Sequence, residues 1–212
     1  MYTLYYNPGT ASMVIHLALL ETGADYRLEL VDLDAGAQRS PEYLKLNPNG
    51  VVPTLIIDGK PFFEAAAGLM TIADRHPEAQ LAPAQGSLER AAWNQWIMHL
   101  ANTVQPAFRL WFYPHDVDAA ESVQATIKEY ARGRIEAAWD RIDAHLAANG
   151  PYLLGKRLSA ADLMLLMLMR WSRNMPKPVT AWPALEDYAA RMRARPSWKR
   201  LYELEGLTEW GA

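Results

Sequence analysis

The chain has 212 residues, of which 50% are hydrophobic and 21% charged, and this composition excludes an intrinsically disordered chain. Its formal net charge of −3 argues against a protein that binds nucleic acid or a membrane surface through basic residues. Cysteine is absent, which excludes a cysteine nucleophile, a disulfide and a thiolate metal site.

The sequence gives no sign of a membrane span or a secretion signal. Its longest strongly apolar stretch, residues 163–169, is far shorter than the roughly 20 residues that cross a bilayer. The N-terminus runs directly into a strand-like pattern without a basic segment. We therefore expect a cytoplasmic protein.

The chain divides into two parts of different composition. Residues 1–80 contain no tryptophan and carry 5 basic and 10 acidic residues, whereas residues 81–212 contain all eight tryptophans, with 16 basic and 14 acidic residues. Two prolines and a glycine mark the segment between them, and such residues interrupt helices and strands. We expect one domain over residues 1–78, a linker over 79–86 and an all-helical domain over 87–212.

The first part predicts the element order β-α-β-α-β-β-α. A strand at residues 3–6 is followed by a helix at 11–21, which Gly23 ends as a C-cap. A second strand is expected at 26–31 and a short helix at 41–46. Strands at 53–57 and 60–63 flank Asp58-Gly59, a hairpin signal, and a helix at 64–75 completes the domain.

The second part predicts helices. Apolar residues recur every fourth position from Leu88 to Phe108, with Pro106 expected to kink that helix. A long helix is expected at 119–148, and residues 159–162 (SAAD) read as a capping box that opens a buried helix at 163–171. Pro183 and Pro196 each mark the start of a further short helix.

Several segments together resemble a known family. They are residues 5–12 (YYNPGTAS), 39–43 (RSPEY), 47–55 (NPNGVVPTL), 63–67 (FEAAA) and 155–162. Each segment is short, but their order and spacing over nearly the whole chain resemble the cytosolic glutathione transferases, most closely a bacterial, beta-like form that lacks the beta-class cysteine. The resemblance implies an α/β thioredoxin-like N-terminal domain followed by an all-α helical C-terminal domain.

The resemblance implies that glutathione supplies the sulfur, as a co-substrate and with no further cofactor. A thiol with a pKa near ~8.5 is only ~3% thiolate at pH 7, and lowering its pKa by about two corresponds to ~2.7 kcal/mol. The N-terminus of the first helix and a hydroxyl donor could both stabilise the thiolate.

Three hydroxyl groups compete for that donor role: those of Thr10, Ser12 and Tyr6. Thr10 aligns with the serine of one group of classes, Ser12 follows the position of the beta-class cysteine, which is Ala11 here, and Tyr6 matches the tyrosine of other classes. We favour Thr10 and Ser12, because the loop ahead of the helix points at the sulfur in those classes. Alternatively, Ser12 only caps the helix and Thr10 fills a turn.

The resemblance also implies the residues that bind glutathione. Val52 and a cis Pro53 would pair with the cysteinyl part, and Glu64 and the Ala65 N–H would hold the γ-glutamyl group at a helix N-terminus. Ala65 stands where the family often has serine, which predicts weaker binding. Gln38, with Arg39, could reach the glycyl carboxylate, although a solvated loop is an equal alternative.

An aromatic run could line a pocket for a hydrophobic electrophile: Phe108, Trp111, Phe112 and Tyr113, with Arg109 or Trp171 in addition. The alternative is that these residues form core or a dimer contact. The five histidines show no ligand spacing, so we expect no metal site.

The sequence therefore predicts a glutathione transferase that activates the thiol for attack on a hydrophobic electrophile, with a homodimer implied by the family and no nucleic-acid or membrane partner. The alternatives are a glutathione-dependent isomerase, dehalogenase or etherase, or a non-catalytic glutathione-binding regulatory protein. Because no protein cysteine is present to form a mixed disulfide with glutathione, conjugation is favoured over thioltransferase chemistry.

Overall fold

The computed structural model describes residues 1–211. Contacts between residues divide it into two compact units, the first formed by residues 1–82 and 192–211 and the second by residues 83–191. The chain thus folds as an α/β unit and a helical unit, as expected from the sequence.

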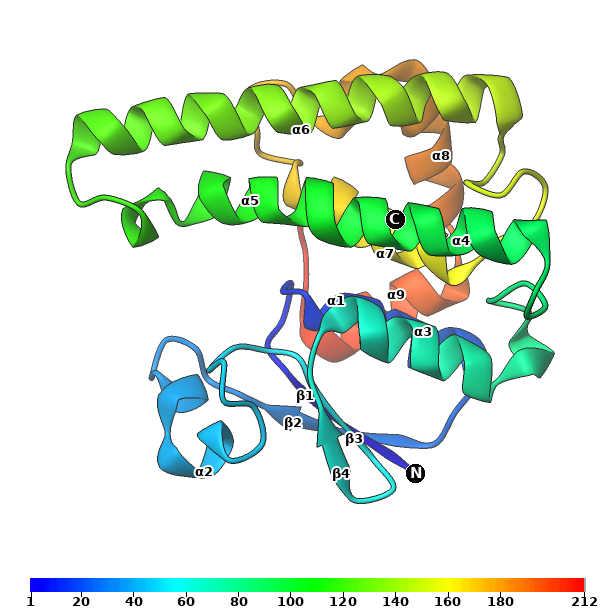
Figure 1. Cartoon of the computed structure of the whole chain (residues 1–212), viewed down its shortest axis with the longest axis horizontal. Helices are drawn as coiled ribbons and strands as arrows, with labels where there is room; N and C mark the ends of the chain where they lie inside the picture. Colours follow the sequence, from blue (N-terminus) through cyan, green and yellow to red (C-terminus); the bar gives the residue numbers. More distant parts are fainter. Residues whose placement is uncertain (212) are drawn as a thin grey trace. The chain divides into compact units, whose positions relative to one another are not determined.

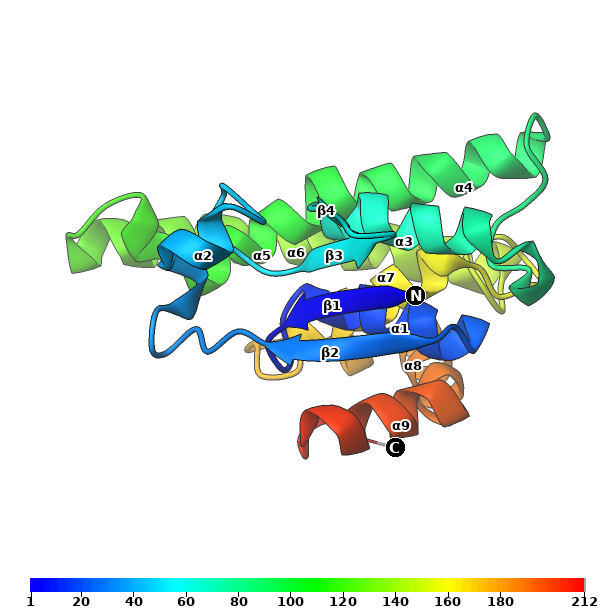
Figure 2. The same cartoon turned by 90° about the horizontal axis from the view of Figure 1, so that it is seen from below.

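The first unit is built on a four-stranded sheet in the order β2-β1-β3-β4 (Figure 2). The strands are β1 (Tyr2–Tyr6), β2 (Tyr26–Leu30), β3 (Thr54–Ile57) and β4 (Lys60–Phe62). Strand β1 pairs parallel with β2 and antiparallel with β3, and β3 pairs antiparallel with β4. The Asp58-Gly59 turn joins β3 to β4 as predicted, with both residues at positive φ.

Helices α1 (Ser12–Thr22) and α3 (Ala65–Arg75) pack against each other on one face of the sheet (Figure 1), and α2 (Pro41–Leu44) follows β2. The element order is therefore the predicted one. The unit is thioredoxin-like because it begins with a parallel β-α-β arrangement and continues with an antiparallel β-hairpin. Gly23 ends α1 at φ 63°, where its N–H donates to carbonyls of the last turn.

The first unit also contains the C-terminal helix α9 (Pro196–Glu205), which packs against α1. This differs from the expected assignment of residues 87–212 to the helical domain, and it places Trp198 and Trp210 with the α/β unit. The reason is that Trp198, Leu201 and Tyr202 of α9 are buried apolar side chains, and contacts rather than chain order decide where they pack.

The second unit contains α4 (Leu88–His99), the π-helical segment η3 (Leu100–Val104), α5 (Gln105–Phe112), α6 (Glu121–Asn149) and α7 (Ala160–Trp171). It also contains most of α8 (Pro183–Arg193). Helices α5 and α6 pack side by side (Figure 1). The π-helical segment ends at Val104, two residues before Pro106, whose missing N–H interrupts the α-helical hydrogen-bond pattern.

The predicted every-fourth stripe is confirmed over its second half and wrong over its first. Leu100, Val104 and Phe108 are buried. Leu88, however, is 87% exposed, and the buried residues of α4 are Arg90, Trp93 and Ile97. Four residues turn a helix through more than one full turn, so an every-fourth pattern drifts around the surface, and alternating steps of three and four follow one face. The stripe of α6 obeys that rule, with Ala131, Ile135, Ala138, Ile142 and Leu146 buried.

Helix α7 is buried along nearly its whole length and begins with the predicted capping box. The Asp162 carboxylate accepts hydrogen bonds from the backbone N–H of Ser159 at 2.8 Å and of Leu153 at 2.9 Å. The hydroxyl groups of Ser159 and Tyr188 also donate to it. Four donors satisfy a fully buried carboxylate, which supports the predicted structural role of Asp162.

Candidate functional site

The segment from Asn7 to Ser12, here called the hydroxyl loop, connects β1 to the first turn of α1. The Oγ1 atom of Thr10 and the Oγ atom of Ser12 lie 2.9 Å apart. Both hydroxyl groups reach the carbonyl oxygen of Asn7, Thr10 at 2.7 Å and Ser12 at 3.1 Å. The loop therefore holds two of the three candidate hydroxyl groups as one hydrogen-bonded pair.

The two hydroxyl groups differ in accessibility. Ser12 is fully buried, whereas Thr10 is half-buried. Because the Asn7 carbonyl can accept from either group, Ser12 can continue to satisfy it when Thr10 donates elsewhere. The arrangement makes Thr10 the outer hydroxyl and Ser12 its inner support.

Ser12 does not cap α1. The residue ahead of the helix is Ala11, which has no side chain that could cap it, and the Ser12 N–H of the first turn donates to Oγ1 of Thr10 at 3.4 Å. Ser12 instead accepts a hydrogen bond from the Asn7 N–H at 3.4 Å and bonds to Thr10, so its oxygen holds the hydroxyl loop together. This finding removes the capping alternative for Ser12 but leaves its role toward a ligand a prediction.

Tyr6, the third candidate, lies at the end of β1 with its ring edge-on to His16, the ring centroids being 6.3 Å apart. Burial raises the pKa of Tyr6, and the negative charge of Glu205 raises it further. The phenol therefore stays protonated at neutral pH and could donate a hydrogen bond but not act as a base. No hydrogen bond connects Tyr6 to Thr10 or Ser12.

The Val52–Pro53 peptide bond is cis, as the family resemblance predicts. Val52 is half-buried, and the turn before it is fixed by two side chains that both donate to the Val51 carbonyl oxygen at 2.8 Å, the Tyr43 hydroxyl and the Asn47 amide. Asn47 is fully buried. Residues 47–53 therefore present the backbone of Val52 from a loop held by two part-buried hydrogen bonds.

Glu64 occupies the position just before α3 with φ 73°, an uncommon backbone conformation for a residue other than glycine. Its side chain is exposed and forms no hydrogen bond with the residues that the structure describes. Ala65 is buried and starts the helix, so its N–H belongs to the unpaired first turn. This geometry leaves a carboxylate and helix N–H groups available at one place, and their binding of the γ-glutamyl group stays a prediction.

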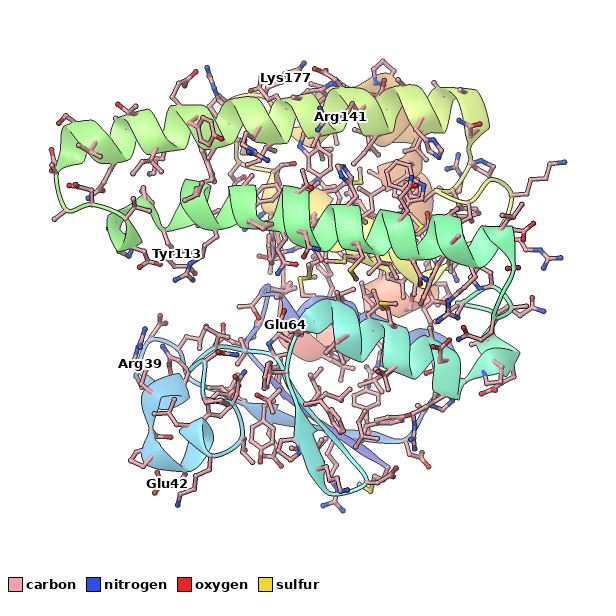
Figure 3. All side chains as sticks on the ribbon, in the orientation of Figure 1. Arg39, Glu42, Glu64, Tyr113, Arg141 and Lys177 are labelled. Carbon is pink, nitrogen blue, oxygen red and sulfur yellow. The ribbon has the colours of Figure 1, made fainter. Side chains whose placement is uncertain are left out.

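Gln38 and Arg39 lie in the segment ahead of α2, and Figure 3 shows Arg39 there and Glu64 at the start of α3. Arg39 is exposed. The Oε1 atom of Gln38 is buried and has no hydrogen-bond partner among residues 1–211. An unpaired buried oxygen is costly and calls for a donor, so this oxygen supports a contact between Gln38 and an N–H group of a ligand rather than a carboxylate.

In the second unit, only some of the aromatic residues predicted to line a pocket are exposed. Phe108 is fully buried beneath Phe112, which stacks on it at 6.0 Å between ring centroids, and Trp171 lies edge-on to both. Phe112 and Tyr113 are each 44% exposed. Trp111 lies under Lys128 of α6, 5.9 Å from its ring centroid. Phe108 therefore lies beneath the surface of this aromatic group, and of the predicted residues only Phe112 and Tyr113 present large exposed rings.

Arg109 also belongs to this aromatic group. Its guanidinium lies 4.4 Å from the centroid of the Tyr113 ring and pairs with Asp116. Because Asp116 already neutralises Arg109, this cation is not a ready partner for an anionic ligand. The aromatic group therefore favours an apolar molecule over a charged one.

Two residues near the hydroxyl loop were not predicted from the sequence, His16 and Glu205. The Glu205 carboxylate accepts a hydrogen bond from the Gly9 N–H at 3.0 Å and lies 2.7 Å from Nδ1 of His16. Both side chains are fully buried. A histidine within an apolar helix is a weak hint of such a partner, and nothing in the sequence connects it to a glutamate near the other end of the chain.

Within the residues that the structure describes, no group of three or more metal-ligating side chains occurs and no helix is long and apolar enough to cross a membrane.

The sequence matches two family profiles, described as glutathione S-transferase, N-terminal domain, over residues 1–74, and glutathione S-transferase, C-terminal domain, over residues 101–202. It is 30% identical over 204 residues to glutathione S-transferase GST-4.5 of Xanthomonas campestris pv. campestris, covering 96% of this chain and 98% of that protein. It is also 28% identical to the disulfide-bond oxidoreductase YfcG of Escherichia coli, over 93% of this chain and 92% of that protein. Identity to a maleylacetoacetate isomerase of Rhizobium meliloti is 30%, over 83% of each chain.

The fold matches solved structures of the same group. A sphingomonad glutathione S-transferase complexed with glutathione superposes with a TM-score of 0.85 at 31% identity, covering 97% of this chain and all of that one. A Sulfitobacter glutathione transferase homologue with bound glutathione gives a TM-score of 0.89 at 27% identity, covering 98% of this chain and 99% of that one. Together with the thioredoxin-like unit, the cis proline and the helical unit, these matches show that the chain belongs to the glutathione S-transferase family of enzymes.

Proposed function

We propose that this protein binds glutathione on its first unit, activates the thiol and transfers the sulfur to a hydrophobic electrophile. The observation that carries the proposal is the pairing of the Thr10 and Ser12 hydroxyl groups at the start of α1. The glutathione thiol gives up its proton to solvent water, the thiolate sulfur bonds to the electrophilic carbon, and the leaving group departs with the electron pair of its broken bond.

Thr10 is proposed as the donor to the thiolate. It is the more accessible of the pair, and its hydrogen bond to Asn7 can be replaced by the one from Ser12. The dipole of α1 adds to the stabilisation, because the thiolate would lie near the positive end of that helix. Tyr6 is the weaker candidate, since its ring packs on His16 and it forms no hydrogen bond with the loop hydroxyl groups.

Glutathione is proposed to contact Val52 and Pro53 with its cysteinyl part, Glu64 and Ala65 with its γ-glutamyl group and Gln38 with its glycyl end. The exposed, unpartnered Glu64 carboxylate supports an ion pair with the ligand ammonium. The electrophile is proposed to lie on Phe112 and Tyr113, whose exposed rings present apolar area. The proposal also includes a homodimer, which a measurement of the mass in solution checks, and a cytoplasmic location.

The proposal is tested by retention on immobilised glutathione and by turnover with an aromatic halide. Thr10→Val keeps the side-chain shape without the hydroxyl and should lower kcat/KM about ten- to a hundredfold, as expected for losing a hydrogen bond to a charged group. Ser12→Ala should lower it less. If neither substitution lowers the rate tenfold, the same assay on Tyr6→Phe decides whether the phenol is the donor.

Two relatives are named as a disulfide-bond oxidoreductase and a maleylacetoacetate isomerase, and their names suggest disulfide reduction and isomerisation as alternative activities. The assay panel therefore includes a cis-alkene isomerisation substrate and a low-molecular-weight disulfide. Because the chain lacks cysteine, disulfide reduction would require both thiols to come from glutathione, which predicts that two glutathione molecules are oxidised to their disulfide for each disulfide reduced to two thiols. Retention without turnover on any substrate would favour a binding protein.

A further inference from the structure

We propose that Glu205 is a positioning residue for the hydroxyl loop: its carboxylate, held by His16, fixes Gly9 and thereby aims Thr10. This inference rests on the proposed function, because it assigns the loop a role in thiol activation. It is carried by hydrogen bonds and burial within the first unit.

The hydroxyl loop is anchored at its start, where the Asn7 side-chain amide donates to the Val31 carbonyl oxygen at 3.0 Å. Gly9 adopts φ 74°, in the left-handed region that glycine enters at little cost, and the Thr10 N–H turns back to the Asn7 carbonyl at 3.3 Å. The hydroxyl groups bond only within the loop, to each other and to Asn7. The Gly9 N–H is different, because it donates at 3.0 Å to the carboxylate of Glu205, which lies 196 residues away in the sequence.

Both oxygens of Glu205 are engaged. Oε2 accepts from Gly9, and Oε1 lies 2.7 Å from Nδ1 of His16, with both side chains fully buried. Since an ionised carboxylate can only accept, Nδ1 carries the hydrogen of that contact. The other ring nitrogen of His16 lies 3.1 Å from the Tyr26 hydroxyl. The carboxylate is thereby oriented from α1 and β2 before it meets the loop.

Helix α9 is held in place independently of this contact. At its other end, Arg195 donates two hydrogen bonds of 2.7 Å to the Glu21 carboxylate at the end of α1, and Ser197 donates to the same group. Trp198 and Leu201 are buried between these two polar contacts. Loss of the Glu205 carboxylate should therefore remove this anchor of Gly9 while α9 stays docked.

The negative charge of Glu205 opposes thiolate formation, so any catalytic benefit must come from geometry. Glu205→Gln and Glu205→Met both remove the charge and have similar size. Only glutamine keeps an oxygen that can accept from the Gly9 N–H. Comparing the two variants at equal charge isolates the positioning effect from the electrostatic one.

The experiment measures kcat and KM for glutathione, and backbone amide exchange in the ligand-free proteins. Glu205→Gln should keep kcat within about threefold, whereas Glu205→Met should lower it about ten- to a hundredfold, as expected for a misplaced catalytic group. Amide exchange at Gly9 should be slow in the wild type and in Glu205→Gln and fast in Glu205→Met. Glu21→Gln, on the same pair of helices, serves as the matched control and should change neither kcat nor Gly9 exchange.

Equal kcat and equal Gly9 exchange in the glutamine and methionine variants would overturn the proposal. If the wild type neither binds nor turns over glutathione, the proposed function fails, and Gly9 exchange alone still tests whether Glu205 holds the loop. Should Glu205→Met not fold, the wild-type Gly9 amide decides: exchange at the rate of an unprotected loop amide contradicts the anchor, and slow exchange supports it.

Discussion

At the residue scale, the site depends on small differences between neighbouring side chains. Thr10 and Ser12 carry the same functional group two positions apart, but one is half-buried and the other fully buried. Alternative roles for them could not be separated from residue type alone. Their burial and shared acceptor, the Asn7 carbonyl, make Thr10 the proposed donor and Ser12 its support.

Ala65 offers a gain-of-function prediction at the same scale. It begins α3 beside Glu64 and is buried, so a serine adds only one oxygen there. If the γ-glutamyl carboxylate binds at this helix start, Ala65→Ser should lower KM for glutathione about fivefold by adding a net hydrogen bond of about 1 kcal/mol. Steady-state kinetics with glutathione varied check it. Ala67→Ser, on the exposed side of the same turn, should leave KM unchanged.

At the scale of elements, turns and caps carried most of the predictive signal. Gly23, the Asp58-Gly59 turn and the Ser159–Asp162 capping box each ended or opened an element where expected. They are reliable because one or two residues satisfy local backbone groups without help from the rest of the chain. The first half of the predicted every-fourth stripe, from Leu88 to Trp96, was wrong because a four-residue repeat does not match the helical turn.

The contact between α1 and α9 gives a pH prediction. Burial acts to raise the pKa of Glu21, but hydrogen bonds from Arg195 and Ser197 and the charge of Arg195 outweigh burial and hold it below its ordinary value of 4.5. A lowered folded-state pKa means that the contribution to stability is present above pH 4.5 and is lost as pH falls through the folded-state pKa.

Glu21→Gln should therefore destabilise the protein by about 1–2 kcal/mol near pH 7 and by less near pH 3. Urea unfolding at both pH values measures the difference. Glu203→Gln provides the control, because the Glu203–Arg200 pair lies on α9, is largely exposed and contributes little to stability. An equal loss of stability for Glu21→Gln at the two pH values would contradict the linkage.

At the scale of the whole molecule, the chain does not divide where its composition does. Charge and tryptophan content change near residue 80, but α9 returns to the first unit after the helices of the second. The α/β unit is therefore made from both ends of the chain, and residues 1–82 alone lack part of their core.

Deletion of residues 196–212 should accordingly unfold the first unit. It removes the buried side chains of Trp198, Leu201 and Tyr202, a loss of about 6 kcal/mol of burial energy, comparable to the stability of a whole domain. Retention on immobilised glutathione should disappear, and proteases should cleave within residues 1–82. Deletion of residues 207–212 alone keeps α9, and this variant should still be retained on immobilised glutathione and should resist cleavage within residues 1–82. A truncated protein that still bound glutathione would show that α9 is dispensable.

The sequence by itself determined the order of elements, their caps and turns, the family and the segments that carry the proposed glutathione site, because these depend on residues close together in the chain. The tertiary structure decided which hydroxyl is accessible, that Phe108 lies beneath the surface of its aromatic group, and that Glu205 reaches Gly9. A contact between residues almost 200 positions apart produces no periodicity or spacing in the sequence from which it could be predicted. It exists only because burial of the apolar face of α9 brings the two ends of the chain together.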